Sequence, residues 1–402
     1  MEKFFVKLKK ERIEIEKRTF LLLLNIPPVQ EYVAYQNAIS NNEISLVDLK
    51  DLAEKADVPY PLFFAPLNKV IVQIKDKDKE LYQKLPSRQE ILLGFRGKMK
   101  SGDIELIVKD LARKQEFLKK RILISSTEND FVGSVAKNIA KGISDKKIAE
   151  EIREYFDLDL KELRKMSKND VLDYLTKKSE NKNILISYSS YTYMPQEISK
   201  GLYLSGFCVK DKKFPYIFIN TRDGDEKPII LETSGRQIFT LLSMLVCIGM
   251  NKFVLSTKKG QSKDPSRKKI FSIVAEILVP KEDVENLTIR SLDDLKEQAQ
   301  LFKVTPSMLL MRLRELKLIK KEVADAYSFK LDQEIKAMEA KKVYRQPKQV
   351  TGYGKYNGER FSREVVSAYK SRKISLDETK NILFRKGKMD INLLNEYAKK
   401  FN

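Results

Sequence analysis

The chain has 402 residues, of which 42% are hydrophobic and 33% charged, so a folded protein of several domains is expected and a disordered one is not. Its 77 Lys and Arg exceed its 56 Asp and Glu by 21, which favours a polyanion such as nucleic acid as a partner, although an AT-rich genome also enriches lysine and that explanation stays open. The absence of histidine excludes every hydrolytic mechanism that depends on an imidazole base, and two cysteines are too few for a disulfide framework or a cysteine-based zinc site.

Residues 1–85 are predicted to be a helical region similar to a degenerate small repressor. The stretch SLVDLKDLAEKADVPYPLFF places Ser45 as the N-cap of a helix whose Leu46, Leu49 and Leu52 recur at helical spacing. The preceding residues match a recognition helix poorly. Two hypotheses therefore stay open: that this region contacts DNA, or that it is a remnant that only packs on the rest of the fold. Charges interrupt the apolar N-terminus and the longest apolar run is too short to span a bilayer, so a cytoplasmic protein without membrane contact is expected.

Residues 86–180 are predicted to be a helical connector. A long helix from Asp103 carries an apolar face, and its opposite face is expected in solvent or near phosphate. That polar face consists of Lys109, Arg113, Lys114, Lys119 and Lys120. Ser144 is the predicted N-cap of the next helix, which reads ISDKKIAEEIREYFDL, and a further surface helix lies within residues 165–182.

Residues 181–285 change from helical to strand-like periodicity. Three short runs rich in β-branched and aromatic residues, NILISYSSYTY, GLYLSGFCV and YIFIN, precede two helices, RQIFTLLSMLVCIGM and SRKKIFSIVAEILVP. This order predicts a compact domain in which a small sheet packs on helices. The chain as a whole is therefore expected to be a mostly helical α+β protein.

Residues 286–343 have a helix-turn-helix pattern, with Ser291 and Thr305 as N-caps and Pro306 at the first helical position. The second helix and the residues after it carry cations that are predicted to contact DNA, unless the helix pair only packs on the preceding domain. These cations are Arg312, Arg314, Lys317, Lys320 and Lys321.

Residues 344–402 form a basic C-terminal region, predicted to open with a Gly/Pro-rich linker and to close with three short helices. Aromatic residues alternate with cations along the linker and just after it, which is typical of nucleic-acid binding. They are Tyr344, Arg345, Lys348, Tyr353, Lys355, Tyr356 and Arg360.

Taken in order, FVGS, IAEEIREYF, SGFCV, FPYIFIN, RQIFTLL, FSIVAEILVP and LFKVTPSMLLMRLRELKLI resemble the ImmA/IrrE family of zinc metallopeptidases. The resemblance implies a zincin-like middle domain, often preceded by a repressor-like region. In that family a segment like RQIFTLL runs into HExxH, whose two histidines bind zinc while the glutamate activates water. The matching positions here are Ser243, Met244 and Cys247, and none can perform those tasks.

The resemblance also implies an acidic third ligand before Ala275–Pro280, where this chain has Arg267, Lys268 and Lys269, with only Asp264 nearby. Zinc is therefore expected to be lost, with no other cofactor. The resulting hypothesis is a non-catalytic regulatory or antitoxin-like protein that binds a protein partner, a repressor or a toxin, and possibly DNA. The alternative is a divergent metallopeptidase that cleaves a repressor or another regulatory protein.

Overall fold

The computed structural model describes residues 3–84, 104–121, 128–190, 192–198, 204–223, 230–231, 233–252, 255–257, 265–339, 347–384 and 391–402. It is mostly helical with small mixed sheets, which confirms the predicted α+β class. Among the described helices, none combines the length and the hydropathy that a membrane crossing requires.

The N-terminal unit begins with a β-hairpin, so the prediction that residues 1–85 are helical is wrong for their first part. Strand β1 (Lys3–Leu8) pairs antiparallel with β2 (Glu11–Glu16) and parallel with β3 (Glu43–Ser45). Phe4 and Val6 are fully buried while their neighbours are not, which is the period-two pattern of a strand with one buried face. The run ERIEIE of β2 alternates charged and apolar residues, which is the sequence signal of a half-buried strand.

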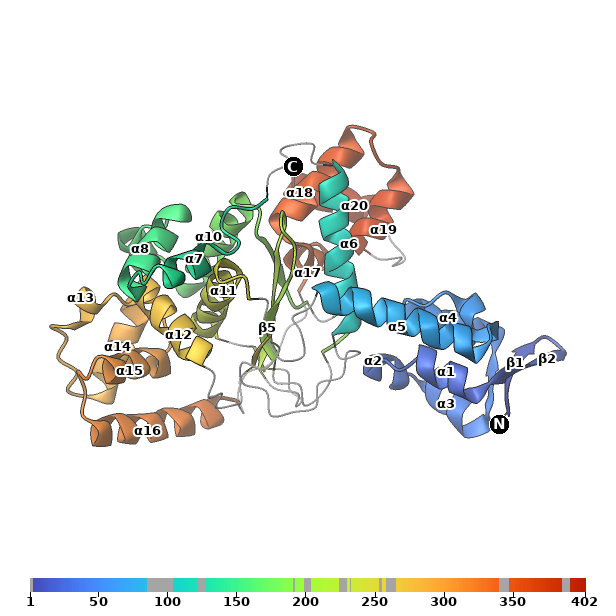
Figure 1. Cartoon of the computed structure of the whole chain (residues 1–402), viewed down its shortest axis with the longest axis horizontal. Helices are drawn as coiled ribbons and strands as arrows, with labels where there is room; N and C mark the ends of the chain where they lie inside the picture. Colours follow the sequence, from blue (N-terminus) through green and yellow to red (C-terminus); the bar gives the residue numbers. More distant parts are fainter. Residues whose placement is uncertain are drawn as a thin grey trace.

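Helices cover this small sheet, and the Phe4 and Phe20 rings stack in their core with centroids 4.4 Å apart. Ser45 caps α4 through the Asp48 N–H, as predicted. The elements that follow β2 are α1 (Lys17–Leu23), α2 (Pro27–Gln30), α3 (Val33–Asn41), α4 (Leu46–Lys55), the 3₁₀ helix η1 (Tyr60–Phe64) and α5 (Leu67–Lys84). Figure 1 shows this unit at one end of the molecule, with α5 reaching toward α6 (Glu105–Arg121).

A four-stranded sheet lies at the centre of the chain, in the order β4-β6-β5-β9. Strand β4 runs parallel to β6, whereas β5 pairs antiparallel with both β6 and β9. The strands are β4 (Leu185–Tyr188), β5 (Leu204–Val209), β6 (Tyr216–Ile219) and β9 (Leu255–Thr257), and β7 (Arg222–Asp223) pairs separately with β8 (Ile230–Leu231). The three predicted strand runs are thus confirmed.

Side chains of this sheet divide between two hydrophobic cores. Ile217 and Ile219 belong to the core that contains α11 (Ser234–Gly249), whereas Tyr216 and Phe218 belong to the core that contains α6 and the C-terminal helices. Alternate residues of a strand point to opposite faces, so the sheet is buried on both sides. Helix α6 of the predicted connector and the C-terminal region therefore meet on the same face of the sheet (Figure 1), whereas the connector residues from Phe131 onward belong to the other core.

Helices on the α11 side surround that helix. Those before the sheet are α7 (Ser134–Ala140), α8 (Asp145–Tyr155), α9 (Leu160–Lys165) and α10 (Lys168–Asn181). Those after it are α12 (Pro265–Leu278), α13 (Lys281–Val284), α14 (Leu292–Leu301), α15 (Pro306–Glu315) and α16 (Lys321–Glu339). The predicted N-caps Ser144, Ser291 and Thr305 all accept the expected backbone hydrogen bond.

Four helices, and not three, form the described C-terminal region: α17 (Gln349–Asn357), α18 (Glu359–Lys370), α19 (Leu376–Phe384) and α20 (Ile391–Lys400). The predicted linker contains α17, and its glycines allow close packing. A Cβ on Gly352 would lie 2.0 Å from a ring carbon of Tyr193, and one on Gly354 would lie 2.6 Å from the Phe401 ring. These glycines therefore mark contacts and do not mark a flexible linker.

Candidate functional site

Helix α11 carries the three positions that correspond to HExxH, and it is the central helix of its core. Of its 16 residues, 13 are buried. The sheet covers it through β5 and β6, while α10 and α12 pack beside it. A zinc hydrolase needs an open coordination position for water, whereas the side chains of Ser243, Met244 and Cys247 are all buried.

Ser243 and Met244 have ordinary structural roles. Ser243 is 6% exposed, and its hydroxyl donates a 2.7 Å hydrogen bond to the carbonyl of Phe239, one turn earlier. Met244 is 1% exposed, and its sulfur lies 3.5 Å from the thiol sulfur of Cys208 on β5. The thioether thus fills space between α11 and the sheet.

Cys247 is fully buried, and burial raises the pKa of its thiol to about 12 although Lys252 acts in the opposite direction. The thiolate is the form that binds metals and attacks carbonyl groups. Near neutral pH this thiol therefore stays protonated. Burial of Cys247 thus disfavours its thiolate form in this conformation.

The side chains that could replace the zinc ligands were sought among the residues that the structure describes. Within the described part of the chain, no three His, Cys, Asp or Glu side chains gather closely enough to hold a metal ion. Lys269 of the basic triplet pairs with Asp145 on α8. Asp264 lies outside the described residues.

The structure brings the segments of the resemblance together around α11. The Gly133 N–H of FVGS donates to the Ile248 carbonyl at the end of α11, at 3.2 Å. Helix α8, which contains IAEEIREY, packs on α12, and the Arg153 guanidinium donates to the Glu276 carbonyl at 2.7 Å. FVGS, IAEEIREY and AEILVP, which are separate in the sequence, thus lie close together in the structure.

Arg312 is buried, which disfavours the DNA contact predicted for it. Its side chain is 2% exposed and forms an ion pair with Glu276, the buried glutamate of AEILVP on α12. The same guanidinium reaches Glu315 at 2.8 Å and donates to the Val279 carbonyl at 3.3 Å. These contacts join α15 to α12.

The other predicted DNA contacts on and after α15 lie nearer the surface. Arg314 pairs with Asp325 at 3.1 Å, while Lys317, Lys320 and Lys321 are exposed. Half of α15 faces the core, namely Met308, Leu309, Leu310, Arg312 and Leu313. Its exposed residues are Met311, Arg314 and Glu315, so its outward face carries one cation and one acid. The structure thus favours the packing role for this helix pair.

A buried polar network joins α6 to α17. It contains Lys114 and Tyr356, which were predicted to face solvent or nucleic acid. The Tyr356 hydroxyl donates to Asp110 at 2.8 Å, and the Lys114 ammonium lies 3.9 Å from the centre of the Tyr356 ring and 3.4 Å from Asp110. Lys114 is buried, so it is not part of the solvent face of α6. Tyr356 is likewise a core residue and cannot stack on a base.

The remaining cations of the α6 polar face are mostly paired. Lys109 bonds to Glu105, Arg113 to Asp57 and Lys119 to Asp211, whereas Lys120 is exposed. In the C-terminal stretch, Lys348 and Lys355 are exposed, and Tyr344 and Arg345 lie outside the described residues.

A buried carboxylate stands where α10 meets α18. Glu180 is 4% exposed, and one of its oxygens accepts the Arg360 N–H at 2.8 Å, in the first turn of α18. Desolvation raises the pKa of this carboxyl to about 7, against hydrogen bonds from the backbone and the nearby Arg360 and Arg363. The contact ties the C-terminal region to the central part of the chain.

Comparison of the chain with known proteins gives no match to a family model, to a curated protein or to a solved structure.

Proposed function

We propose that this chain is a non-catalytic regulatory or antitoxin-like protein of the ImmA/IrrE type, which acts by binding a protein partner. Its zincin-like core is proposed to survive as a scaffold, without zinc. The observation that carries the proposal is the packing at Ser243, Met244 and Cys247, where core contacts occupy the positions that would hold metal and base.

The arrangement around α11 supports the scaffold part of this proposal. A small mixed sheet lies on one side of α11, and α12 lies beside it with the Glu276–Arg312 ion pair at its end. Both cysteines are buried free thiols, which suits a proposed location in the reducing cytoplasm. A loss of chemistry with retention of fold leaves binding as the remaining use of such a scaffold.

The experiment is to purify the untagged chain together with its bound partner and to determine the intact mass of that partner. We expect a stoichiometric complex in which the partner is uncut, with the same mass whether or not zinc or a chelator is added. A partner that is cut at one peptide bond, with cleavage stopped by the chelator, would instead support the divergent peptidase.

A further inference from the structure

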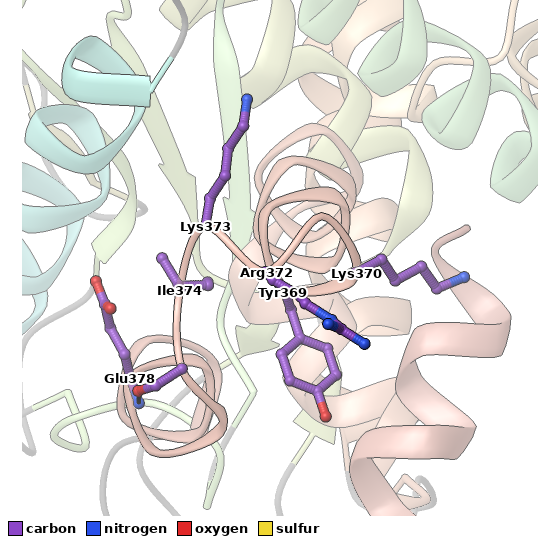
Figure 2. Close-up of a pocket in the computed structure, with 7 residues that line it drawn as sticks. Tyr369, Lys370, Arg372, Lys373, Ile374 and Glu378 are labelled. Atoms are coloured by element: carbon purple, nitrogen blue, oxygen red, sulfur yellow. Dashed lines mark hydrogen bonds between the residues drawn. The ribbon is translucent and has the colours of Figure 1, made fainter.

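An open depression of about 640 Å³ lies where α18 ends and the chain turns into α19. Its walls include Tyr369, Lys370, Arg372, Lys373, Ile374 and Glu378, and Figure 2 shows the three cationic side chains spreading outward from the turn. Lys370, Arg372 and Lys373 are here called the turn patch.

The positive charge of the turn patch is not neutralised by described carboxylates. All three side chains are exposed, and no carboxylate in the described ranges forms an ion pair with any of them. Lys370 instead donates to the neutral side-chain oxygen of Asn402 at 2.6 Å. The acid of the depression, Glu378, lies 3.5 Å from Arg121 of α6. Three adjacent cations therefore face solvent.

The backbone that carries the turn patch is held in place. The Arg372 and Lys373 N–H groups donate to the carbonyls of Tyr369 and Ala368, both at 2.9 Å. The Arg121 guanidinium donates to the Lys373 carbonyl at 2.8 Å, and Ile374 is buried behind the turn. A ligand would meet these charges without first ordering the turn, so less conformational entropy is lost on binding.

Arg372 has a left-handed backbone conformation. Its φ is +57°, at the position after a helix end where glycine is the residue most often found. An arginine there is less favourable for the fold than glycine would be. Lys303 and Lys317 adopt the same conformation after α14 and α15, so the case for the turn patch depends on its charge and exposure.

We propose that the turn patch binds the phosphate backbone of a single-stranded nucleic acid, with the partly exposed Tyr369 ring available to stack on a base. Cations beside an aromatic ring in a concave surface match the way proteins hold single strands. An anionic membrane fits less well, because surface binding to lipid also needs exposed apolar side chains, and Ile374 is buried. This inference goes beyond the proposed protein-partner role and does not depend on zinc.

The test is fluorescence anisotropy of a labelled single-stranded oligonucleotide, over about 50 to 200 mM salt. The variant is Lys370→Glu/Arg372→Glu/Lys373→Glu. The matched control is Lys137→Glu/Lys141→Glu/Lys161→Glu, which changes the net charge by the same amount at exposed positions of another part of the chain. Circular dichroism and thermal unfolding verify that both variants are folded.

We expect the patch variant to lose about tenfold or more in affinity, with a salt dependence reduced by about 2 in log–log slope, and the control to lose much less. Equal losses in the two variants would overturn the proposal, as would a larger loss in the control or no binding by the unchanged chain. Tighter binding to duplex of the same sequence, or to vesicles containing phosphatidylserine, would also overturn it.

The variant Arg372→Gly distinguishes an effect on nucleic-acid affinity from an effect on stability. We expect this variant to unfold at a higher temperature than the unchanged chain and yet to bind the single strand several-fold more weakly. Unchanged affinity in the more stable variant would remove Arg372 from the contact. Neither readout involves the partner's mass, so failure here is distinct from failure of the proposed function.

Discussion

The guanidinium of Arg312 lies against the carboxylate of Glu276 inside the core and joins α15 to α12. Removal of one member of a buried ion pair leaves the other charge without compensation. We therefore expect Arg312→Ala to lower the free energy of unfolding by about 3–5 kcal/mol, measured by urea denaturation. Lys317→Ala, at an exposed position, should change it by less than about 0.5 kcal/mol. A small effect of Arg312→Ala would contradict the structural role assigned to this pair.

The burial of both thiols leads to a second prediction, which concerns their reactivity. Neither Cys208 nor Cys247 should react with an aromatic disulfide reagent at about pH 8 in the folded protein, and both should react after unfolding in guanidinium. Because the folded pKa of Cys247 is raised to about 12, its contribution to stability is present below the ordinary thiol pKa and is lost as pH rises toward 12. Rapid labelling of Cys247 in the native state would show that α11 is accessible.

Glu180 predicts a pH-dependent stability. Its folded pKa of about 7 exceeds the ordinary value of 4.5, so its favourable contribution is full below pH 4.5 and is lost as pH rises through 7. Glu180→Gln removes this titration and keeps an acceptor for the Arg360 N–H. As pH rises from 4.5 to 7, the free energy of unfolding of the variant should increase by up to about 3 kcal/mol relative to that of the unchanged chain.

The control for Glu180 is Glu359→Gln, which changes an exposed acid on the neighbouring helix. Its stability difference from the unchanged chain should vary little over the same pH range. A pH-independent difference for Glu180→Gln would show that the carboxyl at the junction of α10 and α18 is not held in a desolvated site.

Arg372→Gly should stabilise the fold by about 1 kcal/mol, since glycine adopts a φ of +57° without steric cost. The control Arg363→Gly, within α18, should instead destabilise the fold by about 1 kcal/mol. Thermal and urea unfolding of the two variants measure both effects. A loss of stability in Arg372→Gly would mean that the arginine side chain supports the turn.

Local features of this chain were predictable because they depend on neighbouring residues. The caps Ser144, Ser291 and Thr305 and the end of α12 before Pro280 follow from side-chain and backbone chemistry within a single turn. The N-terminal hairpin was missed although ERIEIE has the alternation of a half-buried strand. The pairing of β1 with Glu43–Ser45 could not be predicted in this way, because the two segments are remote in sequence.

The positions of charged side chains in the site could not be predicted in the same way. Arg312 and Lys114 carry the same charge as Lys317 and Lys120, and only tertiary contacts with Glu276 and with Asp110 distinguish the buried pair from the exposed one. The run YKSRK at residues 369–373 was a usable signal for the turn patch, because it combines an aromatic residue with three cations.

The zinc content of the untagged protein tests the central claim most directly. The chain would be expressed with added zinc, purified without chelators and measured by inductively coupled plasma mass spectrometry, beside Cys247→Ala. The account predicts far less than one zinc per chain in both proteins. Stoichiometric zinc that Cys247→Ala abolishes would contradict it.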